Sequence, residues 1–215
     1  MRWSIPNILT VLRLLAAPGV AVMFLYFARP LADWFALTLF ILAAITDYFD
    51  GYLARLWKQE SKFGAMMDPI ADKAMVVIAI MVLTGYSGMN PWLILPATVI
   101  LFREVFVSGL REFLGAKAGL LKVTKLAKWK TTAQMVAIAV LFLGTGLEYL
   151  NGVKMHGMTP DQYLDAVSAG LADPVRACGK RDCASLAGDV GLVLMWVAAV
   201  LTAITGLDYF RKSLP

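Results

Sequence analysis

Four aspartates in the first third of the chain have a spacing that suits metal chemistry. Asp47 and Asp50 are three residues apart, and Asp68 and Asp72 are four apart. On a helix, either spacing places both carboxylates of a pair on one face. Several carboxylates at one place repel one another unless cations compensate their charge, and an all-oxygen ligand set suits Mg²⁺, Mn²⁺ or Ca²⁺ rather than Zn²⁺. The pattern therefore predicts a divalent-cation site.

The residues that follow the first aspartate pair add features of a phosphate-binding site. At about 100° per residue, one helical arc of about 140° holds Asp47, Asp50, Gly51, Ala54 and Arg55. The small Gly51 and Ala54 leave room for a bulky ligand, and Arg55 is a fixed cation suited to phosphate. Charges that simply reach water at a membrane surface would explain one aspartate, but not this whole set on matched faces.

Composition places these residues in or near a membrane. The 215-residue chain is 60% hydrophobic and 16% charged, with a mean hydropathy of +0.70. Soluble domains average about 45–50% apolar and about 25% charged residues, so a water-soluble globule is excluded. The apolar content also excludes disorder, and two cysteines cannot build a disulfide scaffold. The net charge of +5 indicates topology and anionic-lipid contact, and only weakly nucleic-acid binding.

Six apolar stretches are long enough to cross a bilayer, which takes roughly 20 helical residues. We expect an all-α integral membrane protein, a six-transmembrane-helix bundle with a cytoplasm-facing polar cavity, formed as a single domain over 1–215. Pro69 would lie in the first turn of the third helix, where a missing N–H group is tolerated. The expected spans are 7–28, 32–54, 70–88, 91–113, 128–148 and 189–210.

Lysine and arginine residues predict the orientation. With the N-terminus in the cytoplasm, 15 of the 20 Lys and Arg residues lie on the cytoplasmic side or at adjoining helix ends. Both termini and the aspartates then face the cytoplasm in a multi-pass protein of the inner (cytoplasmic) membrane. The segment 149–188 becomes an extended outer-face loop. An oxidising compartment would allow its Cys178 and Cys183 to form a disulfide, although two unpaired thiols fit the sequence as well.

Two further groups of polar residues lie near the same membrane surface. The polar half of the fourth span is either an anion site or a buried Arg–Glu network that holds helices together. The lysines that open the fifth span suit anionic lipid headgroups or an anionic substrate. These residues are Arg103, Glu104, Ser108, Arg111 and Glu112 in the fourth span, and Lys125, Lys128 and Lys130 in the fifth.

The complete run of spaced residues resembles the signature of the CDP-alcohol phosphatidyltransferase family. It reads Asp47-x2-Asp50-Gly51-x2-Ala54-Arg55-x8-Gly64-x3-Asp68-x3-Asp72, with no departure. The resemblance implies an integral membrane enzyme that moves a phosphatidyl group from CDP-diacylglycerol to an alcohol and releases CMP. It further implies that Asp47, Asp50 and Asp68 hold metal, that Asp72 is both ligand and general base, and that the protein is a homodimer.

The donor site follows from the same resemblance. It places Asn7, Thr10 and Arg13 of the first span beside the nucleotide. Arg13 also argues against a cleaved signal peptide, because it interrupts the apolar run. The expected cofactors are two divalent cations, Mg²⁺ or Mn²⁺. The residues expected to bind CDP-diacylglycerol are Asn7, Thr10, Arg13, Gly51, Arg55 and Ser61.

A phosphorylated acceptor is favoured over a neutral alcohol. Its phosphate must be held beside four carboxylates, which requires a basic wall. The stretches 103–112 and 128–134 also resemble those of bacterial members of the family. This resemblance implies sn-glycerol 3-phosphate as the acceptor, with inositol phosphate or phosphatidylglycerol as alternatives for the same chemistry, and no nucleic-acid partner. A divalent-cation transporter is a rival of another class, although a cation path has no need of Arg55 or Arg111. The residues expected to bind the acceptor phosphate are Arg103, Arg111, Lys125, Lys128 and Lys130.

Overall fold

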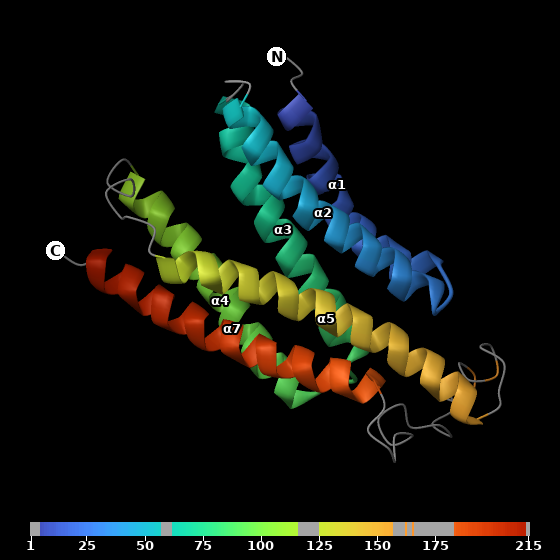
Figure 1. Cartoon of the computed structure of the whole chain (residues 1–215). Coiled ribbons are helices and arrows are strands. Elements are labelled where there is room, and N and C mark those ends of the chain that lie inside the picture. Colours follow the sequence, from blue (N-terminus) through green and yellow to red (C-terminus); the bar gives the residue numbers. More distant parts are fainter. Residues whose placement is uncertain are drawn as a thin grey trace.

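The computed structural model describes residues 5–56, 62–115, 125–156, 162, 165 and 183–213. Within these ranges the chain forms six long helices and the short connections between several of them (Figure 1). This confirms the all-helical prediction. The helices are α1 (Ile5–Tyr26), α2 (Leu31–Leu56), α3 (Lys62–Tyr86), α4 (Pro91–Leu114), α5 (Lys125–His156) and α7 (Cys183–Ser213).

Four of these helices meet the length and composition expected of a membrane span. They are Asn7–Tyr26 in α1, Pro91–Leu114 in α4, Trp129–Leu150 in α5 and Leu186–Lys212 in α7. Helices α2 and α3 are also long, with 26 and 25 residues. They carry the signature aspartates. The protein therefore has the helices of a multi-pass membrane protein.

Two sequence expectations about helix boundaries were wrong. Helix α3 begins at Lys62, so Pro69 lies inside the helix and not in its first turn. A membrane helix tolerates such a proline because neighbouring groups can satisfy the freed carbonyl. The loop expected over 149–188 is shorter, because α5 continues to His156 and α7 begins at Cys183. Hydropathy marks where a helix leaves the apolar layer, but a helix can continue beyond that point. Cys178 lies outside the described residues, and the disulfide stays a prediction.

The helices form two groups that meet along part of their length. Helix α1 packs against α2 and α3, while α7 packs against α4 and α5. The contacts between the groups, of α2 with α5 and of α3 with α4 and α5, are less extensive. Figure 1 shows the groups diverging toward the end of the bundle where α1 begins.

The opposite end of the bundle is held by Arg29. Its guanidinium donates to both carboxylate oxygens of Asp33 at 2.8 and 2.7 Å, and to the carbonyl oxygen of Thr145 at 2.9 Å. It also lies over the rings of Tyr86 and Tyr149, with 5.3 and 5.0 Å from its central carbon to the ring centroids. Since these residues come from α2, α3 and α5, Arg29 joins the two helix groups.

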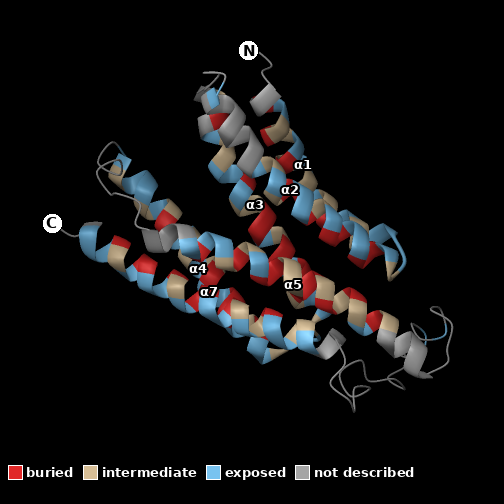
Figure 2. Cartoon of the chain, in the orientation of Figure 1, coloured by how far each residue is buried: buried red, intermediate tan, exposed pale blue. Residues whose placement is uncertain are grey.

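The core between the helices is apolar and includes close backbone contacts. Figure 2 shows buried residues on several of the helices. Phe40, Ile80 and Phe142 are almost fully buried within it. A Cβ atom added at Gly144 would lie 3.1 Å from the backbone nitrogen of Gly188, so α5 and α7 approach each other where neither has a side chain. Small residues allow such close packing of membrane helices.

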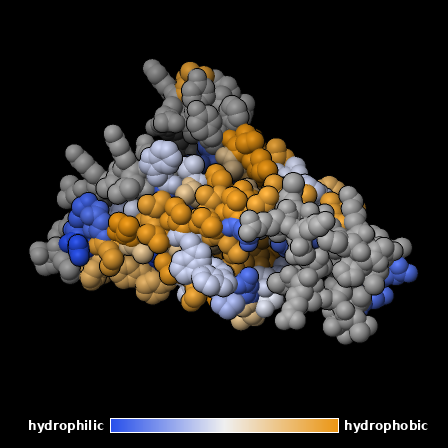
Figure 3. Space-filling model, turned by 60° about the horizontal axis from the view of Figure 1, so that its bottom comes forward, coloured by the Kyte–Doolittle hydropathy of each residue, from blue (hydrophilic) through white to orange (hydrophobic). Residues whose placement is uncertain are grey.

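The outer surface of the helices is also apolar. Large hydrophobic side chains such as Leu15, Phe102 and Val193 are well exposed. Figure 3 shows hydrophobic surface across the middle of one face, with hydrophilic atoms toward its left edge. Apolar patches of this extent are unusual on soluble monomers, so lipid is the natural surrounding of this surface.

Candidate functional site

The path of the chain brings residues from three helices to the end of the bundle where α1 begins. Thr10 and Arg13 lie in the first half of α1, Asp47 in the last part of α2, and Asp68 and Asp72 in the first part of α3. Because α1 and α3 run antiparallel to α2, these positions share one end. Packing of α1 against both neighbours then brings the side chains into contact.

Arg13 lies at the centre of three signature carboxylates. Its side chain is only 2% exposed, while those of Asp47, Asp68 and Asp72 are about half-exposed. The guanidinium donates a short hydrogen bond to Asp47, and it lies 3.4 Å from Asp68 and 3.2 Å from Asp72. Thr10 adds a 2.8 Å hydrogen bond from its hydroxyl to Asp68. We call Asp47, Asp68 and Asp72 the carboxylate cluster.

The remaining residues expected at the donor site divide into two sets. Asn7 is buried in α1, one turn before Thr10. The side chains of Asp50, Gly51 and Arg55, and residue Ser61, lie outside the described part of the structure. The structure therefore brings three of the four signature aspartates together with Thr10 and Arg13, and it leaves the fourth aspartate as a prediction.

The carboxylate cluster has the donor chemistry of a hard-cation site. Its members offer only oxygen atoms, and they already surround one positive group, the Arg13 guanidinium. Carboxylate oxygens are the ligands that Mg²⁺ and Mn²⁺ prefer. Among the described residues, however, no three acidic, histidine or cysteine side chains have the mutual placement of a metal site. The donor types of the cluster nevertheless fit such cations.

A second cluster lies on the other helix group, around Glu104. Lys130 of α5 and Arg103 of α4 both reach its Oε1 atom, Lys130 by a short contact and Arg103 at 3.2 Å. Ser108 donates to the backbone carbonyl of Glu104, and Lys73 of α3 donates a short hydrogen bond to the Ser108 hydroxyl. We call these five residues the Glu104 network. It contains three cations and one carboxylate.

Tyr209 of α7 extends this basic region and was not singled out from the sequence. It is buried, and its ring lies 5.9 Å from the guanidinium carbon of Arg103 and 5.6 Å from that of Arg111. Its hydroxyl accepts a 3.4 Å hydrogen bond from Arg111. In the sequence, a tyrosine near the end of a span reads as an ordinary interface aromatic, so no local signal marks it. The side chains of Lys125 and Lys128 lie outside the described part, and Glu112 is exposed.

The sequence left two interpretations of the fourth span open, a buried Arg–Glu network and an anion site. Both are compatible with this geometry. Arg103 and Lys130 pair with Glu104 inside the bundle, as a structural network would. Yet the network keeps two positive charges more than negative ones, as an anion site would. Asp72 and Lys73 are consecutive residues of α3, so the carboxylate cluster and the Glu104 network adjoin each other.

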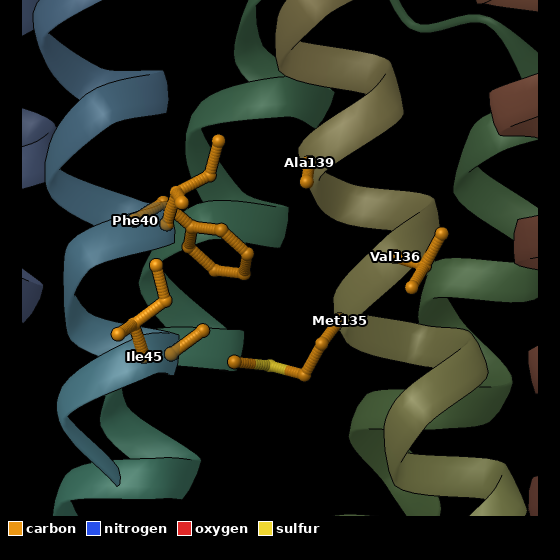
Figure 4. Close-up of a pocket in the computed structure, with 7 residues that line it drawn as sticks. Phe40, Ile45, Met135, Val136 and Ala139 are labelled. Atoms are coloured by element: carbon orange, nitrogen blue, oxygen red, sulfur yellow. The ribbon is translucent and has the colours of Figure 1, made fainter. Parts of the chain in front are cut away.

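A hollow of about 400 Å³ lies between α2 and α5 (Figure 4). Ile45, at one end of it, is only two residues from Asp47 of the carboxylate cluster. An entirely apolar lining cannot perform chemistry on charged groups, but it suits an alkyl chain. The hollow is lined by Phe40, Ile41, Ala44, Ile45, Met135, Val136 and Ala139.

Comparison with known proteins agrees with this geometry. Residues 3–204 match the profile of the CDP-alcohol phosphatidyltransferases. The chain belongs to the CDP-alcohol phosphatidyltransferase family. The family match covers all the described side chains of the carboxylate cluster and of the Glu104 network.

Individual relatives carry one enzyme name. A protein of Cereibacter sphaeroides named CDP-diacylglycerol–glycerol-3-phosphate 3-phosphatidyltransferase is 80% identical over 215 residues, which is 100% of this chain and 97% of the relative. Proteins of the same name from Rickettsia bellii and Salmonella choleraesuis are 38% and 42% identical. They cover 97% and 80% of this chain, and 94% and 100% of their own lengths.

Proposed function

We propose that this protein transfers the phosphatidyl group of CDP-diacylglycerol to sn-glycerol 3-phosphate, giving phosphatidylglycerophosphate and CMP. Family membership and the shared name of the relatives support this activity. The observation that carries it in the structure is the junction at Asp72 and Lys73. There, a carboxylate cluster suited to cations adjoins a basic network suited to a phosphate.

The carboxylate cluster is the proposed donor site. Asp47, Asp68 and Asp72, with Asp50, would hold two divalent cations, Mg²⁺ or Mn²⁺. When bound, such a pair would neutralise the pyrophosphate oxygens and stabilise the leaving CMP. Asn7, Thr10 and Arg13 come from the helix that lines this site, and they would orient the nucleotide together with Gly51, Arg55 and Ser61.

Asp72 is the proposed general base. Its carboxylate is half-exposed, so a substrate hydroxyl can reach it. It would take the proton of the 1-hydroxyl of glycerol 3-phosphate while that oxygen forms a bond to the phosphorus of the phosphatidyl group. The bond from this phosphorus to the oxygen of CMP breaks, and CMP leaves with the electron pair. General-base catalysis of this kind contributes about 10²–10⁴-fold to a rate.

The basic region beside Asp72 would hold the acceptor phosphate. Arg103 and Lys130 offer charge-assisted hydrogen bonds from inside the bundle, and Arg111 offers them from its surface. Lys125 and Lys128 precede Lys130 on the same helix and complete the proposed set. A neutral acceptor would leave this charge uncompensated.

The donor is a lipid, and its tails need apolar surroundings. We assign one acyl chain to the hollow between α2 and α5, whose lining residue Ile45 is two residues from Asp47 in the sequence. Phe40 lies five residues from Ile45, so the hollow extends about 7.5 Å along α2. A headgroup at the carboxylate cluster would place the first methylenes at its mouth.

We further propose the membrane arrangement that this chemistry requires. All six helices would span the inner membrane, with both termini and a polar cavity between the helix groups facing the cytoplasm, where CMP and glycerol 3-phosphate are soluble. The excess of Lys and Arg at this end supports the orientation. Homodimerisation belongs to the proposal through the family resemblance alone.

The proposed function is tested by assays with several acceptors side by side. Purified protein with CDP-diacylglycerol and Mg²⁺ should release CMP with sn-glycerol 3-phosphate, and far less with inositol phosphate or phosphatidylglycerol. A chelator should abolish release. Equal release with another acceptor would overturn the acceptor assignment. Divalent-cation flux into vesicles that is independent of CDP-diacylglycerol, without any CMP release, would overturn the enzyme assignment.

A further inference from the structure

We propose that Lys73 is a specificity-determining residue that binds the phosphate of the acceptor. The inference rests on the proposed function and adds to it a residue that no sequence pattern singled out. In the free protein Lys73 is held by Ser108, and with acceptor bound its ammonium group moves to the phosphate.

The contacts of Lys73 leave it available for an anion. Its Nζ atom donates across the interface between the helix groups to the hydroxyl of Ser108 on α4. That hydroxyl uses its own hydrogen for the carbonyl oxygen of Glu104. Among the described residues, no carboxylate lies within ion-pair distance of Lys73. The ammonium group therefore donates to a neutral oxygen, the Ser108 hydroxyl. An ammonium group has three hydrogens to donate, and a phosphate oxygen is a stronger acceptor than a hydroxyl.

The charge around Lys73 favours a phosphate. Together with Arg103 and Lys130 it makes three positive charges near the one carboxylate of Glu104. The side chains of Lys130, Arg103 and Glu104 are only 6%, 12% and 12% exposed, so water screens this excess poorly. A phosphate would compensate the two surplus charges. An alcohol without a phosphate would not.

The position of Lys73 also selects which hydroxyl reacts. It follows Asp72 directly on α3, and consecutive helical residues point about 100° apart. Asp72 faces Arg13 and the carboxylate cluster, while Lys73 faces α4. The proposed base and the proposed phosphate ligand are therefore held at a separation fixed by one helix. In glycerol 3-phosphate the 1-hydroxyl and the phosphate stand at opposite ends of a three-carbon chain, which matches this arrangement.

The test separates a phosphate ligand from a residue that only joins helices. Steady-state CMP release is measured for wild type, Lys73→Met, Lys73→Arg and Ser108→Ala, with each substrate varied in turn. Lys73→Met should raise the KM for glycerol 3-phosphate about tenfold or more, the typical effect of losing a charged hydrogen bond, and leave the KM for CDP-diacylglycerol within about twofold of wild type. Lys73→Arg should restore most of the acceptor affinity.

Ser108→Ala is the control variant that decides between the two roles of Lys73. It removes the same bond between α3 and α4 but leaves the ammonium group free to meet the phosphate. Its KM for glycerol 3-phosphate should therefore rise much less than that of Lys73→Met. If Ser108→Ala raised this KM as much as Lys73→Met, the bond would serve only to join the helices, and the inference would be wrong.

A control variant and a second measurement distinguish a specific effect of Lys73 from general damage to the protein. Lys212→Met removes one lysine from an exposed pair with Asp208 on α7 and should leave both KM values unchanged. Should Lys73→Met fail to fold, Lys73→Gln takes its place, and weaker inhibition by inorganic phosphate against glycerol 3-phosphate gives a second reading of the same loss. If the wild type itself releases no CMP with glycerol 3-phosphate, the proposed function fails. If the wild type is active and the acceptor KM of the Lys73 variants is unchanged, only the Lys73 inference fails.

Discussion

Arg13 of α1 and Asp72 of α3 are 59 positions apart in the sequence, yet Nη1 of the arginine lies 3.2 Å from Oδ1 of the aspartate. The same guanidinium contacts Asp47 and Asp68. Helix α1 is thus part of the candidate site and not only a membrane anchor. Its arginine compensates the charge of the carboxylates that would also bind divalent cations.

This relationship predicts a response to metal ions. Arg13→Gln should lower the unfolding temperature by several degrees in the presence of a chelator, because three neighbouring carboxylates lose their shared cation. Adding Mg²⁺ should raise the unfolding temperature more in the variant than in wild type, since Mg²⁺ and the guanidinium compensate the same charges. Thermal unfolding in detergent, with EDTA or MgCl₂, measures both effects.

Arg29→Gln is the matched control for that experiment. It also removes a guanidinium that is paired with an aspartate, in this case the buried Asp33 at the opposite end of the bundle. Its loss of stability should be independent of Mg²⁺. An equal Mg²⁺ response in Arg13→Gln, Arg29→Gln and wild type would show that Arg13 does not occupy the cation site.

The packing of Gly206 predicts an effect on the acceptor. A Cβ atom at this position of α7 would lie 3.0 Å from Cγ of Arg103, so Gly206→Ala should shift the arginine side chain and weaken its contact with Glu104. We expect a severalfold higher KM for glycerol 3-phosphate with little change in the KM for CDP-diacylglycerol. Gly109→Ala is the control, because a Cβ atom there meets nothing within 4 Å. Identical kinetics of the two variants would contradict the placement of Arg103 at the acceptor.

The apolar hollow predicts a dependence on acyl-chain length. Ala139→Trp should fill it and slow the reaction of a long-chain donor much more than that of a short-chain one, because each buried methylene contributes about 0.8 kcal/mol. Competition between dioleoyl and dihexanoyl CDP-diacylglycerol measures this preference. Val193→Trp, on the exposed surface of α7, should leave the preference unchanged. An unaltered ratio in Ala139→Trp would exclude the hollow as a chain site.

Much of the fold was predictable because its signals are local. A run of apolar residues long enough to span a bilayer specifies a helix wherever it occurs. Spacings of three and four residues specify one helical face, so the pairing of Asp68 with Asp72 followed from the sequence. Short connections force neighbouring helices to run antiparallel, which brings Asp47 to the same end.

The rest depended on contacts between distant segments. Arg13 was expected beside the nucleotide, and no local pattern could assign its carboxylate partners on α2 and α3. Tyr209 acquires its role only because α7 packs against α4. Lys73 looked like one of many cytoplasmic lysines until its Ser108 partner was known. The end of α5 and the start of α7 were wrongly predicted because hydropathy locates the apolar part of a helix, and both helices continue beyond it.

The proposed role of Asp72 is tested most directly by the rate of phosphatidylglycerophosphate formation in Asp72→Asn. The asparagine keeps the size of the side chain but can neither accept the proton nor provide a carboxylate charge. Purified variant and wild type are compared at saturating CDP-diacylglycerol, glycerol 3-phosphate and Mg²⁺, with product measured by mass spectrometry. We predict a loss of about 100-fold or more, the usual contribution of a general base, in a protein whose unfolding temperature is close to that of wild type. Product formation within twofold of wild type would contradict the assignment of Asp72 and, with it, the proposed chemistry of the carboxylate cluster.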